Sequence, residues 1–305
     1  MDPIIYIDRA SGERKVEKVY GSSGLQLLYG DDLISKILGA PVLQLLSKVP
    51  FFSALYGYWQ NLSLTRKKIV PFIRNFGVDP TEFREPTDTF RSFNEFFIRK
   101  LKETARPISP GDAVAVIPAD GRYLFYPNIA ECSGFLVKGE KFDLPSLLED
   151  EQLAAQYSQG AMVIARLCPS DYHRYHFPCS GIPRETRFIN GWLYSVNPIA
   201  LKKDIHIFTQ NKRTVCELDT PQFGKVLFLE IGATFVGSIH QTYQPGKYCE
   251  KGAEKGFFSF GASSLILLFQ PGKIAFDQDL IQATADNIEI KCLMGQSMGL
   301  AVPCR

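Results

Sequence analysis

The sequence predicts an α+β fold in which an amphipathic helical N-terminal segment precedes a mainly antiparallel β domain with few short helices. Apolar residues in the first hundred positions recur at helical spacing, whereas short β-prone segments follow one another after Pro110. With 305 residues, 45% of them hydrophobic and 22% charged, the chain can bury the core of one large or two modest domains. We therefore expect an N-terminal region at 1–107 and a β domain at 108–305.

The N-terminal region is predicted to be largely helical. Residues 33–38 show helical spacing, and the aromatic stretch PFFSALYGYWQNL is followed by the basic run LTRKK. Such a segment suits a helix lying in a lipid interface, although an apolar helix face packed on the protein's own core is the commoner arrangement. Residues 33–74 are thus a candidate membrane-docking surface. A further helix should begin at SFNEFFIRKL, where Ser92 and Glu95 match a capping box.

The region after Pro110 is predicted to consist of short strands. AVAVIPADGRYLFYP should form a strand, a turn at Asp120 and Gly121, and a second strand. Segments rich in β-branched, aromatic and leucine residues predict further strands, namely AMVIARL, ETRFINGWLYSV, TVCEL and KVLFLEIGATFVGSI. LPSLLEDEQLAAQY predicts one short helix among them.

The stretch GFFSFGASSLILLFQPGK near the C-terminus predicts a buried strand. Its five consecutive apolar residues, 265–269, are bounded by glycine and proline, as in a strand covered on both faces. Ser263 and Ser264 stand at the mouth of this strand, where serines are usually turn residues.

Composition excludes several classes of protein. A formal charge of +2 and a pI near 8.1 are too mild for a nucleic-acid binder. The seven cysteines are scattered and never form C-x-x-C, which indicates reduced thiols and no structural zinc site. No stretch has eighteen uninterrupted apolar residues, and the first residues lack a signal-peptide pattern, so we expect neither a membrane-spanning helix nor export.

The histidines give the first chemical signal. Two of the four, His173 and His176, lie within PSDYHRYHFP. A zinc site would need further ligands, and Asp171 alone is weak support for one. A hydrogen-bonded polar loop remains an open alternative, since such loops are common at protein surfaces.

Together with Asp120 and the serine pair, these histidines supply the parts of an Asp-His-Ser arrangement. A serine hydroxyl is a weak nucleophile until a neutral imidazole accepts its proton, and a carboxylate can hold that imidazole in the correct tautomer. The serine follows glycine and alanine and leads into a strand, so the G-x-S-x-G turn of ordinary esterases is absent from the sequence.

These residues carry a resemblance to the phosphatidylserine decarboxylases, which are self-cleaving pyruvoyl enzymes. The matching segments are FNEFFIRKL, PADG, DYHRYHFPCSG, YSVNP, GATFVGSI and GASSLILLFQPGK, in the family's order from Phe93 to Lys273. By this resemblance Asp120 and His176 correspond to the family's charge-relay pair and Ser263 to its self-cleaving serine. Cleavage between Ala262 and Ser263 would leave a β chain of residues 1–262 and an α chain of residues 263–305 that remain associated. The family usually has glycine before the cleaved serine, so Ala262 is a departure, although cleavage is still expected.

The resemblance also implies a cofactor made from the chain itself. Ser263 would become a pyruvoyl group that forms a Schiff base with the amine of phosphatidylserine and accepts the electron pair released as CO₂ leaves. No metal is expected. His173 is the candidate proton donor to the substrate carbon.

A diacyl substrate makes the membrane surface the expected partner. The resemblance implies a peripheral enzyme on the cytoplasmic face of the cell (inner) membrane that converts phosphatidylserine to phosphatidylethanolamine. Nucleic acid is not an expected partner, and a homo-oligomer is left open. Two alternatives remain at this point, namely a pyruvoyl-dependent decarboxylase of a soluble amino acid and a non-catalytic β-rich binding protein.

Overall fold

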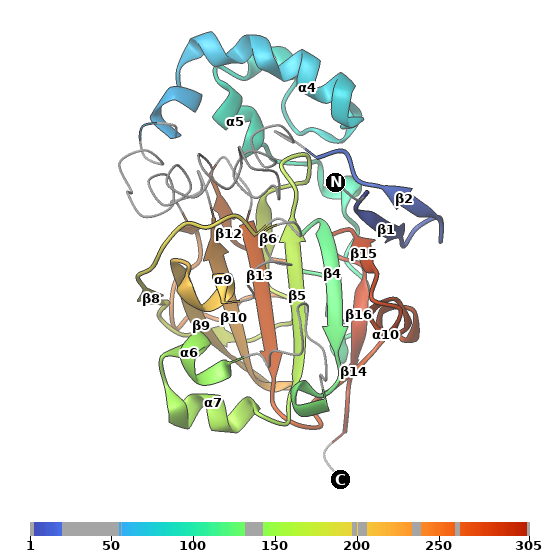
Figure 1. The fold of residues 1–305 in the computed structure, drawn as a ribbon, viewed down its shortest axis with the longest axis vertical. Helices are drawn as coiled ribbons and strands as arrows, with labels where there is room; N and C mark the ends of the chain where they lie inside the picture. The colour runs from blue at the N-terminus through green and yellow to red at the C-terminus, as the bar shows by residue number, and fades with distance from the viewer. Residues whose placement is uncertain are drawn as a thin grey trace, which may run out of the picture.

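The computed structural model describes residues 3–19, 55, 57–131, 143–196, 200, 206–233, 239–259 and 263–303. These residues form one large β-sheet, two small sheets and several short helices (Figure 1). This mixed and mainly antiparallel architecture confirms the predicted fold class. Residues 33–38, where helical spacing predicts a helix, lie outside the described residues, and the boundary between 107 and 108 stays a prediction.

The large sheet joins the two ends of the described chain. Its strands follow the spatial order β2 (Arg14–Val16), β1 (Ile5–Asp8), β15 (Glu289–Cys292), β4 (Gly121–Tyr126), β5 (Ala161–Leu167), β13 (Ser263–Phe269), β10 (Gly224–Gly232), β9 (Arg213–Thr220) and β7 (Ile182–Pro183), with β8 (Arg187–Ile189) also on β9. Neighbouring strands of this sheet are antiparallel except β1 and β15, which are parallel. An N-terminal hairpin therefore extends a sheet that was predicted only from the later residues.

The two small sheets contain three strands each within the described residues. One has the order β11 (Ile239–Gln241), β12 (Glu254–Phe258), β6 (Arg174–His176), and the other β14 (Ile274–Phe276), β16 (Ser297–Ala301), β3 (Val114–Val116). The two strands predicted in AVAVIPADGRYLFYP are present as β3 and β4, but they belong to different sheets and form no hairpin. Gly121 is needed where they diverge, because a Cβ there would lie 2.9 Å from the carbonyl oxygen of Arg166.

The strand predicted in SSLILLF is β13, and it is buried on both faces. Side chains alternate between the two sides of a strand, so Leu265, Leu267 and Phe269 join one hydrophobic cluster and Ile266 and Leu268 join the other. Each fully buried side chain of this size contributes about 1.5–3 kcal/mol to folding. β13 is therefore the centre of the core.

Short helices cover the two faces of the sheet. α6 (Leu144–Leu148), α7 (Glu151–Tyr157) and α9 (Ile207–Gln210) add to one cluster, and α10 (Gln278–Ala285) adds to the other. The single helix predicted for LPSLLEDEQLAAQY is in fact two helices. Glu149 ends α6 with a left-handed φ of 47°, and the Asp150 side chain caps α7 by accepting a hydrogen bond from the amide of Leu153.

A separate phenylalanine cluster holds the helical part before residue 107. It is built from the 3₁₀ turn η2 (Ser63–Lys68), α4 (Ile69–Phe76) and α5 (Phe93–Phe97), with short 3₁₀ turns η3 (Pro80–Glu82), η4 (Thr87–Thr89) and η5 (Glu103–Ala105); η6 (Ile129–Glu131) lies further along the chain. The predicted N-cap is confirmed, because Ser92 accepts a hydrogen bond from the amide of Glu95, while the Glu95 carboxylate accepts from the amide of Arg91 and not from that of Ser92. α4 and α5 lie beyond one end of the large sheet (Figure 1).

Candidate active site

The predicted site residues come together at one end of the large sheet. Ser263 opens β13 opposite Leu167, the last residue of β5, and Arg122 near the start of β4 lies opposite Arg166. Asp120 directly precedes β4, and the loop and strand β6 that carry the two candidate histidines directly follow β5. Antiparallel pairing thus gathers three segments that are far apart in the sequence.

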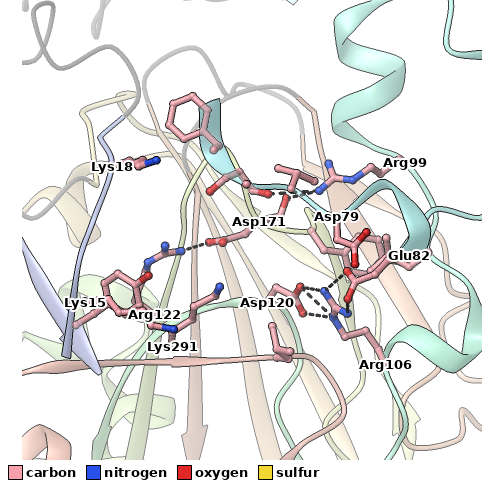
Figure 2. A pocket seen from close by; sticks show the side chains of 18 of the residues that line it. Lys15, Lys18, Asp79, Glu82, Arg99, Arg106, Asp120, Arg122, Asp171 and Lys291 are labelled. Carbon is pink, nitrogen blue, oxygen red and sulfur yellow. Dashed lines mark hydrogen bonds and ion pairs between the residues drawn. The ribbon is translucent and has the colours of Figure 1, made fainter. Parts of the chain in front are cut away.

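The carboxylate of Asp120 is buried in an ion pair with Arg106. Its oxygens accept hydrogen bonds from Arg106 Nε at 2.9 and 3.0 Å, from Arg106 Nη2 at 2.6 Å and from the amide of Met294 at 2.9 Å. Arg106 also donates to both oxygens of Glu82, at 2.9 and 3.0 Å (Figure 2). Burial lowers the pKa of Arg106, but these two carboxylates outweigh it and raise that pKa above its ordinary value.

Asp171 anchors the histidine loop to the sheet. Its Oδ2 accepts hydrogen bonds from Arg122 Nη1 at 2.5 Å and from the amide of Cys168 at 2.7 Å. Arg122 and Arg166, which face each other across the strand pair, both contact Glu17 from the N-terminal segment. This buried network of charges fixes the end of β5 against the start of β4. Asp171 is thereby a structural anchor of the loop.

His176 is buried in β6 with a neutral ring. Its backbone amide donates to the carbonyl of Pro118, so the strand carrying His176 runs beside the segment carrying Asp120. Its ring stacks on Tyr172 with centroids 5.8 Å apart. Burial lowers the pKa of His176 to about 4, against a weaker opposing effect of Glu254. A neutral imidazole is the form that can accept a proton from a serine hydroxyl.

His173 is buried completely in the turn before β6. Its Nδ1 lies 3.0 Å from the carbonyl oxygen of Asp171, and its ring packs on Phe97 with centroids 3.9 Å apart. The backbone carbonyl of His173 accepts a hydrogen bond from the amide of Phe258 in β12. The loop is thus tied to the strand that ends shortly before Ser263.

Ser263 is buried at the start of β13, opposite Gly232 on one side and Leu167 on the other. Its Oγ makes no hydrogen bond with any described residue, and the same holds for the neighbouring hydroxyl of Ser264. Leaving a buried hydroxyl unsatisfied costs about 1–3 kcal/mol. An unsatisfied buried group of this kind calls for an explanation, and a catalytic role is one such explanation. Residues 260–262, including Ala262, lie outside the described residues.

The structure brings the segments together without forming a side-chain relay between Asp120 and His176. The oxygens of Asp120 are engaged by Arg106 and Met294, and His176 Nδ1 has no hydrogen-bond partner among the described residues. The roles of these residues, and those of Ser263 and His173, therefore remain proposals.

A cavity of about 580 Å³ adjoins this end of the sheet. Asp120, Asp171 and Tyr172 line it, together with basic side chains from the N-terminal hairpin and from β15 (Figure 2). Of the described residues, Ser263, His173 and His176 are not in its lining, so the cavity lies beside the serine and not around it. Tyr172 links the two places, since it lines the cavity and stacks on His176.

Sequence reasoning missed Arg106 and Arg99, which the fold places beside Asp120 and Asp171. Arg99 lies within the matching segment FNEFFIRKL, which was a signal for it, whereas Arg106 lies outside every matching segment, and only the pairing of distant segments reveals the partners of both. In the described ranges no group of three histidine, cysteine or acidic residues could hold a metal ion. Cys168, Cys179, Cys216, Cys249 and Cys292 are free thiols, while Cys132 and Cys304 lie outside those ranges. No helix in the part of the chain that is described is long and apolar enough to cross a membrane.

Comparison with known proteins agrees with the resemblance carried by the motifs. Residues 93–300 match the family model of phosphatidylserine decarboxylase. Similar curated proteins include the phosphatidylserine decarboxylase proenzymes of Chlamydia muridarum, 47% identical over 97% of this chain and 96% of the relative, and of Chlamydia caviae, 48% identical over 98% of each. The proenzyme of Chlamydia pneumoniae is 47% identical over 96% of both chains. The chain described above belongs to the phosphatidylserine decarboxylase family.

Proposed function

We propose that this protein converts phosphatidylserine to phosphatidylethanolamine with a pyruvoyl group that it makes from Ser263 by cutting its own chain. The observation that carries the proposal is the buried Ser263 Oγ, which has no hydrogen-bond partner among the described residues and lies at the sheet end that also holds a neutral His176. The names of the similar proteins support the same substrate and the same proenzyme character.

The proposed self-cleavage uses only groups of the chain and water. His176 takes the proton of Ser263, whose Oγ attacks the carbonyl carbon of Ala262 and forms an ester as the amide bond breaks. In the β-elimination that follows, a base removes the Cα proton of residue 263, the C–H electron pair forms the Cα=Cβ double bond and the Cβ–Oγ bond breaks. This leaves Ala262 with a free carboxylate and residue 263 as a dehydroalanine. Water converts that residue to the pyruvoyl group and releases ammonia.

The position of Ser263 fits this prosthetic group. A neutral ketone and amide can occupy a buried strand end without the desolvation cost of a charge, and residue 263 has no exposed surface. When formed, the pyruvoyl group supplies an electron sink for the electron pair that the departing CO₂ leaves behind.

His173 is proposed to deliver the proton to the substrate carbon. The carbonyl oxygen of Asp171 can only accept a hydrogen bond, so Nδ1 of His173 carries its hydrogen toward that oxygen. Proton exchange with the substrate would therefore pass through Nε2.

The two chains produced by cleavage are expected to stay together. β13, at the start of the new α chain, is paired along its whole length with β5 and β10 of the β chain. Its apolar side chains belong to both faces of the core. Separation would expose this core, so the cut changes covalent connection but not the fold.

The helical part is proposed to dock on the cytoplasmic face of the inner membrane. Leu64 and Val70 are 70% and 58% exposed, and Trp59 lies beneath Lys68 at 3.6 Å from its Nζ. Exposed Arg66 beside them adds charge that attracts anionic lipid, where each cation is worth about 1 kcal/mol. α4 and α5 lie beyond the same end of the sheet as the site (Figure 1), so docking would bring the bilayer toward it.

Mass spectrometry of the purified protein tests the cleavage. We expect a β chain that ends at Ala262 and an α chain whose first residue is a pyruvoyl group. Ser263→Ala should give an intact 305-residue chain without activity, whereas Ser264→Ala removes an equally buried hydroxyl and should still cleave. An uncut wild-type chain after prolonged incubation would refute the proposal. CO₂ release from phosphatidylserine but not from free serine would then exclude a soluble amino acid as substrate.

A further inference from the structure

Basic side chains from several separate segments line the cavity beside the site. Lys15 and Lys18 come from the N-terminal hairpin and the residues after it, Arg74 comes from α4, and Lys291 comes from β15. Arg99, just after α5, forms a further part of the wall (Figure 2). The volume of the cavity, about 580 Å³, is within the range of small-molecule sites.

Positive charge is in excess in this cavity. Arg106 is paired with Glu82 and Asp120, Arg122 is paired with Asp171, and Lys15 is paired with Asp8 at 3.1 Å. The remaining cations of the lining are Lys18, Arg74, Arg99 and Lys291, and no carboxylate of the described residues lies within salt-bridge distance of them. Three of the four carboxylates in the lining are thus used in ion pairs, whereas Asp79 accepts hydrogen bonds from Thr81, and four basic residues keep their charge for another partner.

Arg99 shows the imbalance most clearly, because it is only 4% exposed. Its hydrogen bonds to the carbonyl oxygens of Phe96, Ser170 and Asp171 are all long, at 3.4 Å, and its Nε has no partner among the described residues. Burial lowers the pKa of Arg99 to about 10, so it stays charged at neutral pH. Asp120 and Asp171 favour its charge without forming an ion pair, and the guanidinium lies over the rings of Phe83 and Phe96. A buried guanidinium without a directly paired carboxylate is still costly unless an anion compensates it.

We propose that this cavity binds a phosphate group, with Arg99 as its central ligand and Lys18, Arg74 and Lys291 as further cations. On the basis of the proposed function, this phosphate is the phosphodiester of the phospholipid headgroup. Arginine matches phosphate because its planar donors can bind two oxygens at once. The substrate's carboxylate is a poorer candidate, since it loses its charge as CO₂ and an arginine on it would stabilise the ground state. A phosphodiester keeps its charge throughout the reaction.

The place of the cavity agrees with this assignment. Asp120 and Tyr172 line the cavity at the sheet end that carries Ser263, and Tyr172 also stacks on His176, so the serine part of a headgroup anchored there is expected to extend toward residue 263. Anchoring by a group that does not react would supply the binding energy needed to orient the part that does.

Calorimetric titration of the purified, self-processed protein tests the cavity. Glycerophosphoglycerol is the probe because it carries the phosphodiester but no amine, so its binding does not require reaction with the pyruvoyl group. We expect Arg99→Met to weaken this binding about tenfold to a hundredfold, the loss typical of a charge-assisted hydrogen bond. Unchanged affinity in Arg99→Met would overturn the proposal.

Competition experiments distinguish the headgroup phosphodiester from free phosphate, and two lysine variants show whether a loss of binding is specific to the cavity. Inorganic phosphate should compete with the probe and free serine should not, whereas binding of inorganic phosphate alone would overturn the assignment to a headgroup. Lys291→Met removes a cation from the wall and should also weaken binding, while Lys247→Met, at an exposed position outside the cavity, should not. Equal affinities in these two variants would also refute the site.

The kinetic arm distinguishes failure of this inference from failure of the proposed function. Arg99→Met should raise KM for phosphatidylserine more than it lowers kcat, because the residue holds a part of the substrate that does not react. Normal KM with full CO₂ release would remove the cavity from the reaction but leave the decarboxylase assignment intact. If the probe binds through Arg99 but the wild type releases no CO₂, the phosphate site stands and the decarboxylase assignment is refuted.

Discussion

The lowered pKa of His176 predicts that self-cleavage is insensitive to mild acid. With a pKa of about 4, about 97% of His176 is neutral at about pH 5.5, whereas a histidine with the ordinary pKa of about 6.5 would be only about 9% neutral. A base with the ordinary pKa would therefore cut about tenfold more slowly at about pH 5.5 than at about pH 7.5, while this protein should cut at nearly the same rate.

The assay starts from precursor made by cell-free synthesis in the cold and transferred to buffers of different pH. The cleaved fraction is followed over time on denaturing gels, and its identity is confirmed by the mass of the α chain. His176→Gln should remain uncut at every pH. A tenfold fall in the wild-type rate between about pH 7.5 and pH 5.5, with the precursor still folded, would refute the buried neutral base.

The same shift predicts how stability depends on pH. Because the pKa of His176 is lowered by folding, the unfolded chain binds more protons between about pH 4 and pH 6.5. Stability therefore rises with pH through this window and is lost as the pH falls. The contribution of His176 between about pH 7.5 and pH 5.5 is about 1 kcal/mol, small enough for the cleavage assay to be read on folded protein.

Three further predictions concern the neighbouring groups. Arg106→Met should leave the buried carboxylate of Asp120 without its ion pair and lower the free energy of unfolding by about 3–5 kcal/mol in denaturant titrations; a loss below about 1 kcal/mol would contradict this. His173→Gln should still cleave but release CO₂ from phosphatidylserine at least about a hundredfold more slowly, and unchanged turnover would remove it as proton donor. Leu64→Ser should weaken sedimentation with phosphatidylserine-containing vesicles, whereas Phe188→Ser, which alters an exposed apolar residue of β8, should not; equal effects would argue against docking through the helical part.

Local signals in the sequence were sufficient for much of the fold. The apolar run after Ser264 predicts β13 because a strand covered on both faces buries consecutive apolar residues, and the flanking glycine and proline keep the run too short for a helix. Ser92 predicts the start of α5 because a capping hydrogen bond depends on residues three positions apart. The order of the motifs likewise indicated the family, since each motif is a short contiguous segment.

Other features arise from contacts between distant segments, which local patterns do not encode. β3 and β4 leave the expected hairpin because β16 and β15, almost two hundred residues later, offer their edges as partners. No strand is predicted in the N-terminal hairpin, where β1 forms by pairing with β15 from the other end of the described chain.

The candidate site likewise combines features that the sequence predicts with features that depend on tertiary contacts. The sequence by itself determined which residue types are available, namely Asp120, His173, His176 and Ser263, and the chemistry that such groups can perform. Only the tertiary structure decided that the carboxylate of Asp120 is held by Arg106 and that burial keeps His176 neutral. Ionic partners and desolvation depend on what surrounds a side chain in space, and these surroundings come from segments that the chain folds together.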